Sequence, residues 1–332
     1  MKGARLALLV LFAFAALALG APAAGCAGAE EPFVLVGGHP VDAAQIDRDP
    51  EALLPGGVVL MTYVDAAALF KTPLGPDVAE LVKSLLPLGA QAGFVPERDV
   101  VRVWGGVYAL QGVDFCAVVQ GTFDVAAIQK AADAHAVTAF GAPLVKSRYA
   151  GFDLYTAGNV GFAIVTGRTA IAGNETGMRR ALDRLKRDKL ERSVLPWMTG
   201  LARTPNASLA LAADLVNQPA AEGAAKTLPF LLGLKRARVV GNFRRPGVNL
   251  AGALTYPDPQ TAATAATQLK SANAVATLLS WIVAGAFGGT MPPIETKQAG
   301  SDVGFTMAVD ENLVRGLLRA AAGVARMAVV AR

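Results

Sequence analysis

The chain has 332 residues, of which 53% are hydrophobic and 17% are charged, and its formal net charge is +5. This balance is typical of a folded protein with a sizeable core, and it excludes an intrinsically disordered chain. The cysteines and histidines are few and scattered, which excludes a zinc site with the usual ligand spacing; they are Cys26, Cys116, His39 and His135.

Residues 1–25 have the pattern of an export signal. Lys2 and Arg5 precede an uncharged apolar run, 6–19, and small residues lead from there to Cys26. The run is too short to cross a bilayer as a stable helix. We therefore expect this segment to be removed from the mature protein, and it takes no part in the fold.

The signal ends in Ala23-Ala24-Gly25-Cys26, which resembles a bacterial lipobox, although Ala23 stands where that pattern usually has leucine. On this segment alone, the chain resembles uncharacterised lipoproteins of bacterial cell envelopes. The resemblance implies a membrane anchor through a lipid on Cys26, on the periplasmic face. It favours the outer membrane, because Ala27 rather than aspartate follows the cysteine. Ordinary cleavage after Ala23 or Ala29 would instead leave a soluble periplasmic or secreted protein.

Residues 26–52 are rich in acidic side chains and show little periodicity apart from the apolar run 33–36. This composition predicts a tether between the membrane and the folded body, to which the apolar run could add one strand.

The body is predicted to contain two copies of one unit, 53–189 and 206–332, joined by a linker, 190–205. In the first copy we expect strands at 57–65, 101–108, 112–119, 150–154 and 162–172, and helices at 77–88, 124–134 and 176–187. In the second copy we expect strands at 207–214, 237–243, 247–254, 299–303 and 305–309, and helices at 220–232, 259–273 and 311–327.

The order of elements in each copy is β-α-β-β-α-β-β-α, whose core has the split-βαβ, ferredoxin-like order. The predicted fold class is therefore α+β, with antiparallel or mixed sheets that helices cover on one side. The copies are matched at three places, which are Val103 with Val239, Phe115 with Leu250, and 150–154 with 299–303.

The spacing between the matched segments is longer in the second copy. The extra residues fall near 274–287, a stretch that is apolar nearly all round. Such a stretch predicts either a buried core helix or a contact with a partner or lipid, made by side chains such as Trp281.

No sequence motif points to catalysis, because the patterns GxSxG, HExxH, GxxxxGK[ST] and GxGxxG are all missing from the sequence. Asp65 and Asp214 end matched strands, and Asp153 and Asp302 lie in matched turns. We interpret these four as helix caps and turn residues rather than as acid–base pairs or cation ligands. Cys116 lies in an apolar strand and is predicted to be a small buried hydrophobe. The chain is therefore predicted not to be an enzyme and to hold no metal or other cofactor.

Positive charge is concentrated in two segments, 178–192 and 235–245. Their basic side chains include Arg179, Arg180, Arg184, Lys186 and Arg187 in the first segment, and Lys235, Arg236, Arg238, Arg244 and Arg245 in the second. They are interpreted either as solvated faces or as contacts with anionic lipid or an envelope polymer. Nucleic acid is not an expected partner of an exported protein with only 7% aromatic residues.

These observations predict a non-catalytic binding or scaffolding role at the cell envelope, with a protein partner that the sequence does not identify. The alternative is a carrier of an apolar or lipid ligand held between sheet and helices. A cavity lined by apolar side chains would favour the carrier, and a packed interior would favour the scaffold.

Overall fold

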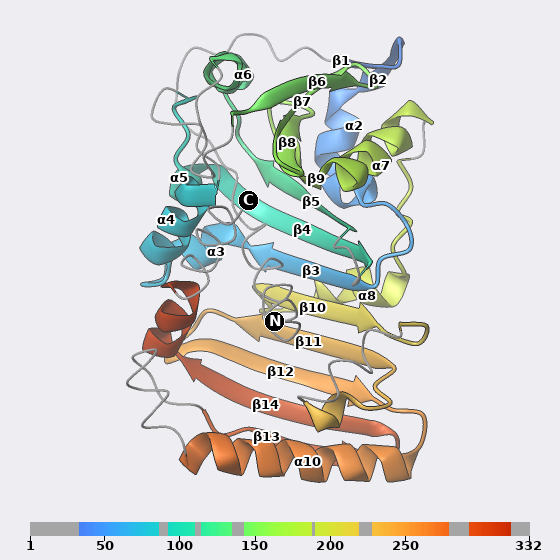
Figure 1. The fold of residues 1–332 in the computed structure, drawn as a ribbon, viewed down its shortest axis with the longest axis vertical. Helices are drawn as coiled ribbons and strands as arrows, with labels where there is room; N and C mark the ends of the chain where they lie inside the picture. Colours follow the sequence, from blue (N-terminus) through green and yellow to red (C-terminus); the bar gives the residue numbers. More distant parts are fainter. Residues whose placement is uncertain are drawn as a thin grey trace.

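The computed structural model describes residues 33–85, 92–109, 114–134, 143–187, 190–218, 228–278 and 292–319. Twelve strands form one continuous sheet that runs the length of the molecule (Figure 1). They are, in chain order, β3 (Leu60–Asp65), β4 (Val100–Ala109), β5 (Asp114–Gly121), β6 (Val145–Tyr149), β7 (Phe152–Ala157), β8 (Val160–Ile164), β9 (Thr169–Asn174), β10 (Leu209–Asp214), β11 (Arg236–Asn242), β12 (Gly247–Thr255), β13 (Glu295–Ala299) and β14 (Asp302–Asp310).

The order of strands across the sheet is β13-β14-β12-β11-β10-β3-β4-β5-β9-β8-β7-β6. Each neighbouring pair is antiparallel. The α+β class is thus confirmed. The split-βαβ order is wrong, because that order places the first and third strands of a unit side by side and parallel, whereas here β3, β4 and β5 follow one another as an antiparallel meander.

Helices and short turns connect the strands and cover them. They are α2 (Ala43–Arg48), α3 (Ala66–Phe70), α4 (Gly75–Leu85), α5 (Pro96–Asp99), α6 (Val125–Asp133), α7 (Glu175–Lys186), α8 (Pro196–Leu201) and α10 (Pro259–Leu278), with the 3-10 turns η1 (Pro50–Leu53) and η3 (Pro229–Leu231). Residues 311–319 are also helical. Side-chain caps begin several of these helices directly at a strand end: Asp65 accepts a hydrogen bond from Ala68 N at 2.9 Å, and Asn174 from Gly177 N at 3.2 Å.

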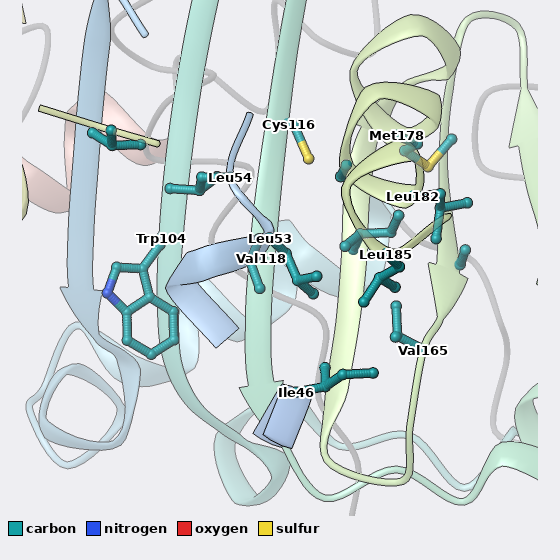
Figure 2. Close-up of a cluster of buried hydrophobic side chains, with 14 of the residues drawn as sticks. Ile46, Leu53, Leu54, Trp104, Cys116, Val118, Val165, Met178, Leu182 and Leu185 are labelled. Atoms are coloured by element: carbon teal, nitrogen blue, oxygen red, sulfur yellow. The ribbon is translucent and has the colours of Figure 1, made fainter. Parts of the chain in front are cut away.

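The first half of the sheet is buried on both faces, because alternate residues of its strands enter different cores. Val103 and Val119 pack with side chains of α3, α4 and α6. Val118 lies on the other face, among side chains of α2, η1 and α7 such as Ile46 and Leu182 (Figure 2). The expectation that helices would cover one side only is therefore wrong for this half.

The N-terminal segment belongs to the body instead of forming a long tether. It contains a two-stranded hairpin, β1 (Phe33–Val36) with β2 (His39–Asp42), followed by α2 and η1. Val36, Ile46 and Leu53 are at most 1% exposed, so the segment completes a core. The predicted tether over 26–52 is wrong from residue 33 onward, and 26–32 lie outside the described residues. The predicted linker is also folded, since Met198 of α8 is buried against β10.

The two halves of the sheet meet at β3 and β10 with reciprocal hydrogen bonds. Asp65 N donates to Ser208 O and Asp214 N donates to Val59 O, both at 2.8 Å. Outward from this centre, β4, β5 and β9 on one side have β11, β12 and β14 as their counterparts on the other. A common origin of the halves remains a prediction, but the ladders show which positions correspond.

The ladders support one predicted match and shift another. Phe115 pairs with Val107, and Leu250 pairs with Gly241, so Phe115 and Leu250 hold corresponding positions. Val103 lies between Val64 and Val119, whereas Ala237 lies between Ala213 and Leu254. The counterpart of Val103 is therefore Ala237 and not Val239, which lies two residues further along the same face.

The match of 150–154 with 299–303 is wrong. The first segment belongs to the β6–β7 hairpin at the edge of the sheet, while β14 lies beside β12 as β9 lies beside β5. The expected strand 162–172 is divided into β8 and β9 by a turn. The halves therefore differ by an added hairpin in the first and by a longer helix, α10, in the second. Of the predicted insertion 274–287, the backbone is helical to residue 278, and Trp281 lies outside the described residues.

Candidate binding site

One face of the second half of the sheet is largely open. Among the described elements, only α8 packs on it. In β12 and β14, Leu254 and Val303 point toward α10 and η3 and are buried. Ala251, Thr306 and Ala308 point to the opposite face and are exposed. Since β12 and β14 are interior strands of the sheet, this exposure marks an open face rather than an edge.

A groove of about 490 Å³ lies on the open face. It crosses β11, β12, β14 and β13, and the loop 204–207 between α8 and β10 forms part of its wall. Small or apolar side chains line its middle, namely Val240, Ala251 and Ala308. A partner can therefore approach the sheet closely there.

Polar side chains lie at two places along the groove. Asn249 Nδ2 donates to Asn242 Oδ1 at 3.1 Å and to Arg244 O at 2.9 Å, while Thr306 Oγ1 donates to Glu295 Oε2 at 3.3 Å. The residues that line the groove include no histidine, no cysteine and a single carboxylate. This arrangement offers hydrogen bonds and apolar contact to a partner, but no pair of groups for acid–base or nucleophilic chemistry.

The arginines of the first basic segment are used within the fold. Arg180 pairs with Asp114 at 2.8 Å and stacks on the Tyr108 ring at 4.4 Å. Arg184 donates to Ala52 O at 2.7 Å, and burial lowers its pKa. Arg179 pairs with Glu175 at 2.6 Å. At the end of α7, Lys186 and Arg187 are exposed, with Arg187 at 3.6 Å from Asp183.

The second basic segment lies on and around β11. Arg236 is 3.8 Å from Asp214 and stacks on the Trp197 ring, and Arg238 pairs with Asp302 at 3.2 Å. Lys235 is half-buried, and Arg244 and Arg245 are exposed in the β11–β12 turn. The first basic segment is on α7, which packs on β5, β8 and β9, and three strands separate β5 from β11. The two basic segments therefore lie on different parts of the sheet.

The other residues singled out in the sequence have structural settings. Cys116 is 1% exposed, and burial raises its pKa to about 12, so its thiol is protected from reaction. Asp214 accepts a hydrogen bond from Val216 N at 3.3 Å. His39 is exposed on β2, while Cys26 and His135 lie outside the described residues. Within the described ranges, no cluster of three or more His, Cys, Asp or Glu side chains could hold a metal ion.

The buried carboxyl group of Glu51 was not predicted from the sequence. Glu51 of η1 is 4% exposed, and its Oε2 atom lies 3.0 Å from Arg203 and 3.4 Å from Arg192. Burial raises its pKa to about 7, with a further rise from Asp49 and an opposing effect of Arg192. No local pattern around residue 51 indicates this site, because the two arginines come from the segment that links the halves.

The fold defines an α+β protein with a long antiparallel sheet and a groove on one open face. No family model matches this chain, and no curated protein matches it. The solved structures of TP0453 are similar in fold. Crystal form III has a TM-score of 0.50 and 11% identity, covering 81% of this chain and 97% of that one. Crystal form I has a TM-score of 0.49 and 11% identity, covering 82% and 97%. At this identity, the likeness shows the fold alone. No helix in the described part of the chain is long and apolar enough to span a membrane.

Proposed function

We propose that this chain is an exported, lipid-anchored protein of the cell envelope with a non-catalytic binding role, and that the groove on the open face holds its partner. One observation carries the assignment of the groove. The first half of the sheet is buried on both faces, whereas the second half leaves the side chains of Ala251, Thr306 and Ala308 exposed on the interior strands β12 and β14.

The chemistry of the groove favours a chain-like polar partner, such as an extended segment of another envelope protein. The small side chains at Ala251 and Ala308 allow a backbone to approach, and the Asn242–Asn249 and Glu295–Thr306 pairs supply donors and acceptors. The alternative, a carrier of an apolar ligand between sheet and helices, is less well supported. The groove lies on the outer surface, and large buried side chains fill the described cores.

The test is site-specific photo-crosslinking in intact cells. A photoreactive residue at position 251 or 308 should yield one defined adduct. The matched control is Ala263, an exposed alanine of α10 outside the groove, which should yield none. Equal adducts from all three positions, or none from the groove, would rule out this site.

Filling the groove gives a second measurement. Ala308→Trp should abolish the adduct formed from position 251, because an indole would occupy the groove, while Ala263→Trp should leave it intact. Both substitutions are at exposed positions, so the fold should be retained, which a thermal melt checks.

A further inference from the structure

The β1–β2 hairpin carries apolar side chains on both of its faces. Val36 and Val41 point inward and are buried. Phe33 and Leu35 are on the outer face, 55% and 65% exposed, and Pro40, the cross-strand partner of Leu35, is exposed beside them. The inner face is explained by the core. The outer face is an apolar surface without a described partner, which in a folded protein marks a contact site.

The position of this hairpin in the chain limits what can cover its outer face. Seven residues lead from Cys26 to Phe33, and a fully extended chain of that length spans at most about 25 Å. A lipid on Cys26 would therefore keep β1 close to the bilayer surface. This step rests on the anchoring that is part of the proposed function.

The hairpin tip lies beside a basic helix end. Gly37 N donates to Ala150 O at 3.0 Å, and a Cβ atom on Gly37 would lie 3.4 Å from Cγ of Lys186, so the hairpin tip lies against the β6–β7 turn and the end of α7. Figure 1 shows β1, β2, β6 and α7 at the same end of the molecule. The exposed cations at the end of α7 are Lys186 and Arg187.

Two carboxylates lie in this region. Asp42, the cross-strand partner of Phe33, is exposed and caps α2 by accepting from Ala44 N at 2.9 Å. Asp183 accepts from the Tyr149 hydroxyl at 2.8 Å and lies 3.6 Å from Arg187. Lys186 has no ion pair among the described residues, so positive charge remains available at the hairpin tip beside Gly37. Exposed apolar side chains flanked by lysine and arginine match the interface of an anionic bilayer.

We propose that the outer face of the β1–β2 hairpin, with Lys186 and Arg187, docks on the bilayer that holds the anchor. Phe33 and Leu35 enter the headgroup region, and the cations contact lipid phosphates. The groove strands β11 to β14 lie toward the opposite end of the sheet from β6. Docking at the hairpin therefore places one end of the sheet at the membrane and the groove at the end away from it.

The depth of the hairpin can be measured on the full acylated protein in vesicles of phosphatidylcholine with phosphatidylglycerol. A nitroxide is placed at Leu35→Cys, and at Leu232→Cys as control, since Leu232 is 61% exposed in the second half. Cys116 is buried and stays unlabelled. The label at 35 should be reached by a lipid-soluble relaxant and shielded from a water-soluble one, and the label at 232 should show the reverse. Equal access of the water-soluble relaxant to both labels overturns the proposal.

Affinity gives an independent readout without the anchor. For the Cys26→Ser chain, Leu35→Ser should weaken binding to these vesicles by about tenfold or more, because a leucine side chain leaves the interface, and Leu232→Ser should not. Lys186→Gln with Arg187→Gln should remove the preference over pure phosphatidylcholine and its salt dependence. No effect, or the same effect from both serine variants, rejects hairpin docking. Crosslinking from position 251 tests the groove separately, so the two failures can be told apart.

Discussion

At the residue scale, polar side chains fix the N-terminal segment to the sheet. Asp47 of α2 accepts hydrogen bonds from Thr166 and Thr169 at 2.5 and 2.7 Å, and its carbonyl accepts from Gln120 at 3.2 Å. Asp49 pairs with Arg192 at 2.6 Å. These contacts join residues at least 73 positions apart, which explains why the segment folds with the body instead of extending from it.

Glu51 makes a pH dependence testable. Its pKa is about 7 in the folded protein against an ordinary value of 4.5. Between these values the folded state keeps a proton that the unfolded state has lost. Its contribution to the free energy of unfolding is therefore full below pH 4.5, falls as pH rises to 7, and is constant above. The total change is at most about 3 kcal/mol, at roughly 1.4 kcal/mol per pKa unit.

Urea denaturation at several pH values, compared between wild type and Glu51→Gln, measures this contribution. The amide cannot ionise, so the variant should lose much of the decline between pH 5 and 7. Burial also raises the pKa of Asp99, to about 6. Its pH-dependent contribution to stability is the same in both proteins, so it cancels in the comparison. Parallel curves for the two proteins would contradict the assignment.

At the element scale, α7 shows why a basic run need not be a binding surface. Its Met178, Leu182 and Leu185 face the core, and Arg180 and Arg184 border that core and reach β5 and η1. The partners of these arginines, Asp114 and the Ala52 carbonyl, come from distant segments, which the local sequence does not reveal.

Two substitutions on α7 separate a structural arginine from a solvated one. Arg180→Met removes the ion pair with Asp114, the stacking on Tyr108 and a hydrogen bond to Gly56 O at 3.2 Å, and should lower the free energy of unfolding by about 1–2 kcal/mol. Arg187→Met, at a side chain that is 67% exposed, should change it by less than about 0.5 kcal/mol. Chemical denaturation measures both, and similar losses would show that Arg180 has no special structural role.

At the scale of the whole molecule, one sheet and a helix bind the halves together. Besides the β3–β10 ladder, Arg315 of the C-terminal helix pairs with Asp77 of α4 at 2.9 Å and donates to Pro73 O at 2.7 Å. These contacts fix the groove in the second half relative to the β1–β2 hairpin in the first half. Docking of the hairpin on a membrane would therefore set the orientation of the groove.

Anchoring is the prediction at this scale. Cys26→Ser should move the protein from the membrane fraction to the soluble periplasmic fraction, because stable attachment needs the acyl chains that the sulfur carries. Fractionation of cells followed by immunoblotting measures this, with Cys116→Ala as the control that leaves the anchor in place. A Cys26→Ser protein that stays with the membrane to the same extent would refute the lipobox interpretation.

The sequence by itself determined the α+β class, the strands at the centre of the sheet from β3 to β5 and from β10 to β12, and local roles such as the cap at Asp65 and the buried thiol of Cys116. These follow from periodicity and local hydrogen bonding, which act over a few residues. The alternation in β12, with large side chains at 248, 250 and 254 and small or polar ones between, also carried the signal of an open face.

Only the tertiary structure decided the strand order, the folding of 33–52 into the core, and the partners of the basic residues. The matched turns at 150 and 299 have similar sequences but lie at different places in the sheet, because which strands pair depends on long-range contacts. The groove also depends on long-range strand pairing. Its lining comes from α8's loop and from strands spread over a hundred residues, which the antiparallel order alone brings to one face.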